Sequence, residues 1–224
     1  MTSRVIAIDG PAGSGKSTTA KAVARRLGLA HLDSGALYRA ATLAALDAGI
    51  DIAAPGIVAL AESLPVRLRL TDAGFEPEVA GVDVSEEVRS DRVTRRVSEV
   101  AALPEVREWV NEALRDATAL HPRGVVIDGR DIGTVVFPDA LVKVFLTAGE
   151  GERARRRLLQ EGRSADDANV REAAGKIARR DRYDSSRQVA PLAQAADAVL
   201  LDTTDLSFEQ QVDKVVEMAR KVFS

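Results

Sequence analysis

Short apolar runs alternate with amphipathic stretches along the chain. Apolar, partly β-branched runs predict buried strands at residues 4–8, 30–33, 125–127, 141–146 and 198–201. Helical periodicity predicts helices over residues 16–27, 34–48, 105–119, 150–160, 168–184 and 207–222, with Ser34 as the N-cap of the second. Because apolar strands separated by helices build parallel sheets, this pattern predicts an α/β fold with a mostly parallel sheet.

Residues 65–84 interrupt this alternation. Apolar and polar side chains alternate over residues 66–70, and short extended pieces follow at residues 75–79 and 81–84. This pattern predicts a small antiparallel sheet that is inserted into the larger fold. A helical region is expected to follow it, opening at residues 85–88 and continuing past Ser98.

The composition narrows the classes of protein. The 224 residues include no Cys and only two His, which excludes disulfide frameworks and cysteine-ligated metals and disfavours a multi-histidine metal site. The net charge of -3 argues against a broad nucleic-acid-binding surface. No apolar run reaches the roughly 18 residues of a membrane span, and the first run is too short for a signal peptide. We therefore expect a cytoplasmic monomer whose partners include neither membranes nor nucleic-acid polymers.

A phosphate-binding pattern, G-x-x-x-x-G-K-[ST], is matched in full by residues 10–17. It stands between a predicted strand and a predicted helix, as its mechanism requires. In such a loop the backbone amides surround phosphate oxygens, the lysine bridges the β- and γ-phosphates, and the hydroxyl after it holds Mg²⁺. The residues predicted to bind ATP are Gly10, Pro11, Ala12, Gly13, Ser14, Gly15, Lys16, Ser17 and Thr18, with Ser17 as the magnesium ligand.

Two further segments that follow strands predict a second site for an anion. Ser34 opens a helix, and Arg39 lies little more than one turn further along it. Arg130 and Asp131 follow the strand at residues 125–127. Loops at the carboxyl ends of parallel strands form the ligand crevice, where an arginine can hold a phosphate and a carboxylate can accept from an amine. There is a simpler alternative for each segment. Ser34 would only cap a helix, and Arg130 and Asp131 would only form a local salt pair.

The basic residues are mostly arginine, with 25 Arg against 6 Lys, which codon bias alone could produce. However, Arg180, Asp184 and Arg187 share one face of a predicted helix within a run of closely spaced arginines. A surface ion pair is one interpretation. A polyanionic ligand would better relieve the repulsion among the guanidinium groups, so this segment is predicted to close as a lid over phosphate. The arginines at positions 153, 155, 156 and 157 favour the same interpretation, a segment that closes over phosphate.

Four segments together resemble the bacterial cytidylate kinases, a family of P-loop nucleoside monophosphate kinases. They are residues 10–18, 32–39, 128–138 and 180–187, they occur in the family's order, and the resemblance covers essentially the whole chain. The resemblance implies transfer of the γ-phosphoryl group of ATP to CMP or dCMP, giving ADP and the diphosphate, with Mg²⁺ as cofactor.

The resemblance also implies an architecture. A five-stranded, mostly parallel sheet flanked by helices would carry a small antiparallel-sheet insert and a helical lid. The chain would form a single kinase domain with a core at about residues 1–60, 120–150 and 190–224, a monophosphate-binding insert at about 61–105, and a lid at about 150–188.

Roles for individual residues follow from the resemblance, motif by motif. It implies a catalytic role for Lys16, Arg130, Arg153 and Arg187. It implies CMP binding by Ser34, Arg39, Arg130 and Arg187 at the phosphate, by Arg180 and Asp184 at the ribose, and by Ser98, Arg107 and Asp131 at the cytosine. Residues 202–204 are the expected place for adenine.

Two alternatives remain open at this stage. The acceptor could be AMP, UMP or a hydroxyl-bearing metabolite; a hydroxyl would need a general base such as Asp128 or Asp33, whereas a phosphate acceptor is already ionised. A P-loop switch or assembly ATPase would need a water-positioning residue and a partner surface, and the sequence displays neither.

Overall fold

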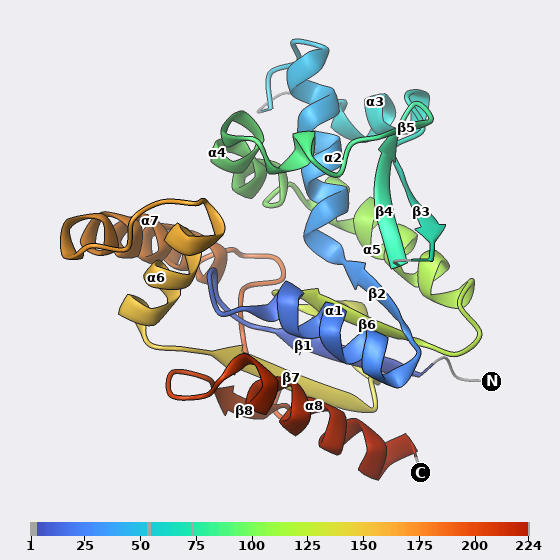
Figure 1. Cartoon of the computed structure of the whole chain (residues 1–224). Helices are drawn as coiled ribbons and strands as arrows, with labels where there is room; N and C mark the ends of the chain where they lie inside the picture. Colours follow the sequence, from blue (N-terminus) through green and yellow to red (C-terminus); the bar gives the residue numbers. More distant parts are fainter. Residues whose placement is uncertain (1–3, 53–54, 73, 224) are drawn as a thin grey trace. The chain divides into compact units, whose positions relative to one another are not determined.

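The computed structural model describes residues 4–52, 55–72 and 74–223 (Figure 1). A five-stranded sheet has the order β2-β6-β1-β7-β8, and a three-stranded sheet has the order β3-β4-β5. The strands are β1 (Val5–Asp9), β2 (Ala30–Asp33), β3 (Arg67–Thr71), β4 (Gly74–Val79), β5 (Val82–Asp83), β6 (Val125–Gly129), β7 (Val142–Thr147) and β8 (Val199–Asp202). The predicted fold class, an α/β fold with a small antiparallel sheet, is confirmed.

The helices are α1 (Lys16–Leu27), α2 (Ser34–Asp47), α3 (Ile57–Ser63), α4 (Asp91–Val100), α5 (Pro104–Ala119), α6 (Glu150–Gln160), α7 (Asp167–Ser185) and α8 (Phe208–Phe223). A 3₁₀ turn at Glu87–Arg89 precedes α4, and a π-helical turn at Ile132–Val136 follows β6. Within the described ranges, no helix is long and apolar enough to span a membrane.

The chain divides into two compact units. Residues 30–125 form one, called here the contiguous unit. Residues 4–29 and 126–224 form the other, called the discontinuous unit. The division into core, insert and lid that the resemblance implies stays a prediction.

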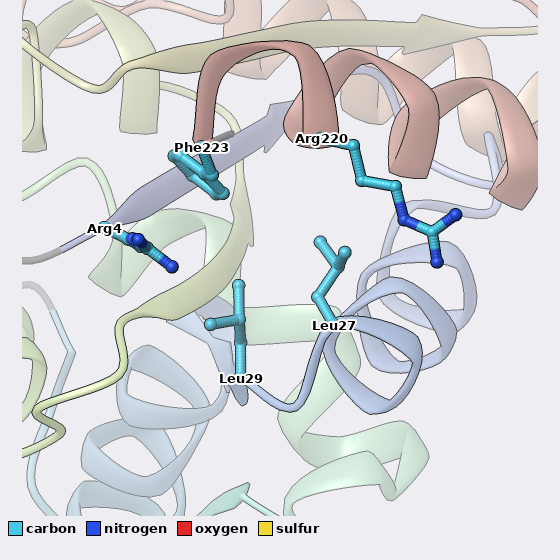
Figure 2. A pocket seen from close by; sticks show the side chains of 5 residues that line it. All are labelled: Arg4, Leu27, Leu29, Arg220 and Phe223. Atoms are coloured by element: carbon cyan, nitrogen blue, oxygen red, sulfur yellow. The ribbon is translucent and has the colours of Figure 1, made fainter.

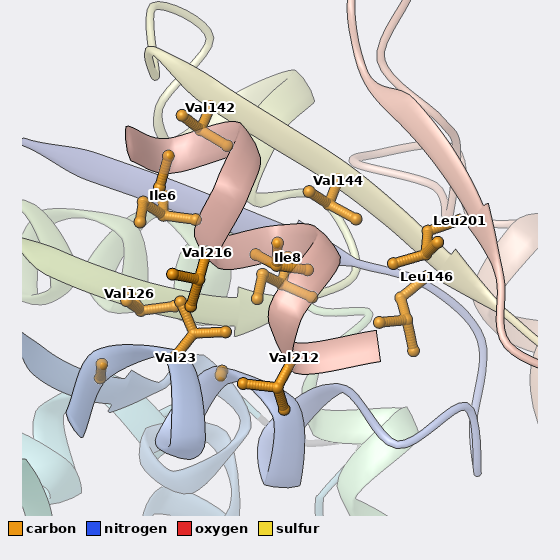
Figure 3. Packing of buried hydrophobic residues seen from close by; sticks show 14 residues of the cluster. Ile6, Ile8, Val23, Val126, Val142, Val144, Leu146, Leu201, Val212 and Val216 are labelled. Carbon is orange, nitrogen blue, oxygen red and sulfur yellow. The ribbon is translucent and has the colours of Figure 1, made fainter. Parts of the chain in front are cut away.

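The core of the discontinuous unit lies where α1 and α8 cover β1, β6, β7 and β8 (Figure 3). β1 pairs in parallel with β7, which places Ile8 opposite Val144, and β7 pairs in parallel with β8. Val23 of α1 and Val212 of α8 are buried against this sheet. Every residue of β1 is buried, as expected of an apolar run in a parallel sheet.

The contiguous unit is built on α2, a helix rich in buried alanines. The antiparallel pairing of β3 with β4 places Arg67 opposite Glu78, whose carboxylate is 2.7 Å from the Arg67 guanidinium. At the start of β4, a Cβ on Gly74 would lie 2.6 Å from the backbone oxygen of His31, so only glycine lets the two backbones approach this closely. The three-stranded sheet predicted over residues 65–84 is therefore present.

Two local predictions differ from the structure, and two elements were not predicted. The N-cap of α2 is Asp33, whose carboxylate accepts from the Gly35 amide at 2.9 Å, so Ser34 is the first helical residue and its predicted capping role is wrong. The helical region expected from residue 85 to beyond Ser98 is divided at Ser90 into a 3₁₀ turn and α4. The short helix α3 and the π-helical turn after β6 were not predicted.

Candidate active site

The predicted phosphate loop joins the end of β1 to the start of α1. Gly13 and Gly15 have φ values of 74° and 88°, a backbone conformation that residues with a side chain rarely adopt. Gly10 has no room for a side chain, because a Cβ there would lie 2.0 Å from the backbone oxygen of Leu146. The loop thus leads into the N-terminus of α1, where the first amides of the helix and the positive end of its dipole together favour an anion.

Lys16 opens α1 and is nearly buried. Its Nζ donates to the backbone oxygen of Pro11 at 2.8 Å. Burial, reinforced by the nearby charge of Arg130, lowers the pKa of Lys16 to about 7, although Asp128 acts in the opposite direction. A polyphosphate at this position would supply the counter-charge that the lysine lacks.

Ser17 and Asp128 bring two oxygen atoms together beside the loop. The Ser17 hydroxyl donates to Asp128 Oδ2 at 2.5 Å, and Asp128 is buried at the end of β6. Mg²⁺ prefers oxygen ligands and usually keeps only one or two from the protein, so this pair fits it. Within the described residues, no cluster of three His, Cys, Asp or Glu side chains could hold a metal alone. A magnesium ion here would therefore depend on phosphate oxygens and water for its other ligands.

Asp9, at the end of β1, holds the segment that follows β6. Its carboxylate accepts from the amides of Ile132 and Gly133 at 2.9 and 2.8 Å. Burial raises the pKa of Asp9 to about 6, while the two amide hydrogen bonds act in the opposite direction. These bonds anchor the π-helical turn directly after Arg130 and Asp131, so the turn's position is set by a residue far away in sequence.

Asp184 of α7 is the centre of an arginine cluster. Arg130 Nε donates to its Oδ2 at 3.1 Å, Arg187 donates to its Oδ1, and Arg180 Nε lies 4.0 Å from Oδ2. Asp184 is only 1% exposed, so the ion pairs are not the surface contact that the simpler interpretation described. Three guanidinium groups around one carboxylate leave excess positive charge, and the charges of Arg130 and Arg180 lower the pKa of Lys16. The discontinuous unit thus concentrates cations beside its phosphate loop.

Arg153, a predicted catalytic residue, contacts the phosphate loop directly. Its Nη1 donates to the backbone oxygen of Ala12 at 2.9 Å, and its Nε donates to Ala148 at 3.1 Å. The same guanidinium pairs with Asp181. Arg153 is therefore held by backbone oxygens and a carboxylate, on the outer side of the loop.

The predicted CMP residues of the contiguous unit form their own set of contacts. Arg39 Nη1 donates to Thr94 Oγ1 and to the Val88 carbonyl, each at 2.9 Å. Ser98 is half-buried and lies one helical turn after Thr94 on α4. The Arg107 guanidinium stacks over the Tyr38 ring at 5.5 Å and donates to Ala101 at 2.9 Å. Ser34 is buried in the first turn of α2.

Four residues beside the loop carry contacts that sequence reasoning missed: Asp9, Arg156, Asp181 and Thr203. Arg156 donates to Thr203 Oγ1 at 2.9 Å, to the Thr203 carbonyl at 2.8 Å and to the Ser14 carbonyl at 3.3 Å. Thr203, in the segment expected to hold adenine, is thereby linked to the phosphate loop. The sequence had indicated a binding role for the segments of Thr203 and Arg156 and placed Asp9 directly before the loop, but it indicated none of these contacts.

A cavity of about 370 Å³ lies elsewhere in the discontinuous unit (Figure 2). It is lined by Arg4, Leu27, Leu29, Arg220 and Phe223, and the Arg4 guanidinium lies over the Phe223 ring at 5.3 Å. Arg4 precedes β1, whereas the phosphate loop follows it. Since a five-residue strand spans roughly 17 Å, this cavity is separate from the phosphate loop.

Comparison with known proteins gives one consistent family. A family model described as cytidylate kinase matches residues 6–221. Cytidylate kinases from Salmonella paratyphi B and Salmonella newport are each 47% identical over 221 residues, covering 97% of this chain and 95% of theirs. An uncharacterized protein from Eubacterium ventriosum, known from a crystal structure, has a TM-score of 0.50 with 11% identity, covering 98% of this chain and 99% of that one. That structural likeness concerns the fold alone.

Proposed function

The chain belongs to the cytidylate kinase family, and we propose that it transfers the γ-phosphoryl group of ATP to CMP or dCMP by direct in-line transfer. ATP would bind at the loop of residues 10–18, and the acceptor would bind through the residues named above. The observation that carries the proposal is the arginine cluster around Asp184, in the same unit as the phosphate loop. A triphosphate loop needs one lysine, whereas two anionic reactants need further cations to offset their repulsion.

On the donor side, the loop amides and the N-terminus of α1 would bind the phosphates. Lys16 would leave its contact with the Pro11 carbonyl and donate to the β- and γ-phosphates. Mg²⁺, held by Ser17 with Asp128 beside it, would neutralise phosphate charge as it develops. Nothing in this arrangement requires a proton to move, because the attacking oxygen already belongs to a phosphate.

On the acceptor side, Arg130 and Arg187 would bind the CMP phosphate together with Ser34 and Arg39. Arg130 and Arg187 each donate to Asp184 through one nitrogen, Nε and Nη2 respectively. A guanidinium has five N–H donors, so it can contact the carboxylate and a phosphate at the same time. Asp184 would then orient the arginines while its remaining oxygen capacity accepts from a ribose hydroxyl.

Cytosine would be selected by its exocyclic amine. Asp131 is buried and, as a carboxylate, can only accept. Uracil presents a carbonyl at the same position, and two facing acceptors in a buried site cannot form a hydrogen bond with each other. This mismatch is the physical basis on which we expect UMP to be a poor acceptor.

An acceptor screen tests the proposal. A coupled assay would measure ADP release with ATP, Mg²⁺ and, in parallel, CMP, dCMP, UMP and AMP. We expect kcat/KM for CMP and dCMP to exceed that for UMP and AMP by at least about a hundredfold. Equal use of UMP or AMP would move the assignment to another acceptor, and acceptor-independent ATP hydrolysis would favour a switch or assembly ATPase. A monomeric, cytoplasmic enzyme is part of the same proposal, and sedimentation of the purified protein checks the monomer.

A further inference from the structure

Both backbone polar groups of Ala12, at the outer tip of the phosphate loop, are held by an ion pair. The Ala12 amide donates to Asp181 Oδ1 at 2.8 Å, and its carbonyl accepts from Arg153 Nη1 at 2.9 Å. Arg153 Nη1 also donates to Asp181 Oδ2 at 2.5 Å, which closes the ring of contacts. The side chains of Arg153 and Asp181 are only 8% and 16% exposed, so water competes little for these bonds.

The Ala12 side chain is held by the same two helices. Its methyl group belongs to an apolar cluster contributed by α6 and α7, whose other buried members are Ala154, Leu158, Ala173 and Ile177. The next residue is also close to α6, because a Cβ on Gly13 would lie 2.9 Å from the Arg153 backbone oxygen. The tip of the loop is therefore seated on the α6–α7 hairpin by its backbone and its side chain together.

The same face of α7 carries the arginine cluster. Asp181 and Asp184 are three residues apart and lie on adjacent turns of one helical surface. Asp181 contacts the loop, while Asp184 binds Arg130 and Arg187. A shift of this part of α7 would displace the phosphate loop and the arginines together. The helix therefore links the loop to the arginines, which phosphoryl transfer requires to be aligned.

We propose that Asp181 is a positioning residue, which sets the conformation of the phosphate loop by holding Ala12 on the α6–α7 hairpin. The donor nucleotide named here rests on the proposed function. Asp181 itself does not touch the nucleotide; it acts through the Ala12 amide and through Arg153. Removing its carboxylate leaves that amide without an acceptor and Arg153 without its counter-charge. The loop is then less ordered before ATP binds, and the entropy cost of ordering it weakens ATP binding.

Two substitutions separate the loop bond from the ion pair. Asp181→Asn keeps an oxygen that can accept from Ala12 but places an amide donor against Arg153, whereas Asp181→Ala removes both interactions. Glu172→Ala is the matched control, because it removes an exposed carboxylate of the same helix, whose partners are Lys176 and Arg163. Binding of ATP without acceptor is measured by isothermal titration calorimetry, alongside steady-state KM values and the melting temperature of each protein.

We expect Asp181→Ala to raise the Kd for ATP about tenfold and Asp181→Asn by about threefold, with KM for CMP within about twofold of wild type. Glu172→Ala should match wild type throughout. Wild-type ATP affinity in Asp181→Ala would overturn the proposal. So would an equal loss of ATP and CMP affinity accompanied by a lower melting temperature, since that pattern belongs to a residue that only supports folding.

The measurement of ATP binding without acceptor keeps this inference distinct from the proposed function. If wild type binds ATP but phosphorylates none of the four acceptors, the proposed function fails, while the comparison of Asp181 variants by ATP binding stands. If CMP is phosphorylated and the Asp181 variants bind ATP normally, only the positioning role fails.

Discussion

Arg130 donates through Nε to Asp184 Oδ2 at 3.1 Å, although the two residues are far apart in sequence. Asp184 is almost fully buried, so the contact is shielded from water. Arg187 donates to the other oxygen of the same carboxylate, so Asp184 keeps an ion-pair partner when one of the two arginines is removed. This redundancy makes the arginines suitable for substitution without loss of the fold.

Arg130→Ala should reduce turnover far more than donor binding. We expect kcat to fall about a hundredfold, because a charge that offsets the transferring phosphoryl group is lost, while KM for ATP stays within about threefold. Steady-state kinetics with CMP measure both values. Arg220→Ala, an exposed arginine of α8, serves as the control and should retain wild-type rates. A comparable loss of kcat in the control would show that the effect at Arg130 is unspecific.

Binding of ATP should depend on pH through Lys16. The pKa of Lys16 is about 7 without ligand, and a bound polyphosphate raises it, so binding takes up protons. Affinity is then greatest below pH 7 and falls, by up to about tenfold per pH unit, as the pH rises from 7 towards the pKa of the complex. Calorimetric titrations from pH 6 to 9 measure the slope. In Lys16→Gln it should become shallower, and an unchanged slope would assign the dependence to the nucleotide itself.

Alanine substitutions at Gly10 and Gly162 should differ in their effect on stability, because only Gly10 has no room for a side chain. Gly10→Ala would place a Cβ 2.0 Å from the Leu146 carbonyl, whereas the same change at Gly162, with φ of 66°, meets nothing within 4 Å. We expect Gly162→Ala to lower the free energy of unfolding by about 1 kcal/mol. Gly10→Ala should lower it by more than about 3 kcal/mol or prevent folding. Urea titration of both variants distinguishes these outcomes, and similar losses would mean that β7 moves aside.

Ser14 offers a stabilising substitution inside the phosphate loop. Its side chain is fully buried, and among the described residues its hydroxyl has no hydrogen-bond partner. Because an unpaired buried hydroxyl costs about 1–3 kcal/mol, Ser14→Ala should raise the free energy of unfolding, by up to about 2 kcal/mol, and leave kcat/KM within about twofold. Thermal unfolding and the kinase assay give the two values. A lower melting temperature would show that the hydroxyl is satisfied by bound water.

The main architecture was predictable from local pattern. Every strand of the five-stranded sheet was predicted, because each contributes at least one buried apolar side chain, although β2 and β8 are only partly buried. The period of the helix also predicted that Arg180, Asp184 and Arg187 share a face, which their ion pairs confirm. What the pattern missed has local causes. α3 buries only Ile57 and Ala61, too few positions to show a period.

Other features depend on contacts that local sequence does not contain. Asp33 and Ser34 are both good caps, and the choice between them follows from the extended conformation in which β2 leaves Asp33. The π-helical turn after β6 takes its position from Asp9, which accepts from two of its amides. Asp181 likewise acquires its partner, Ala12, only through the packing of α7. Contacts such as these, which join segments far apart in sequence, therefore could not be predicted from local sequence.

The discontinuous unit has a consequence for synthesis of the chain. β1 leaves the ribosome early, yet its neighbour β7, where Val144 faces Ile8, is made much later. At about 5–20 residues per second, the apolar side chains of β1 wait on the order of 10 s for their partners. A chain that ends before β7 would leave the edge of β1 that pairs with β7 unpaired, and such a chain should aggregate. The nucleotide loop, whose Gly10 packs against Leu146 of β7, is thus translated well before the strand that completes its surroundings.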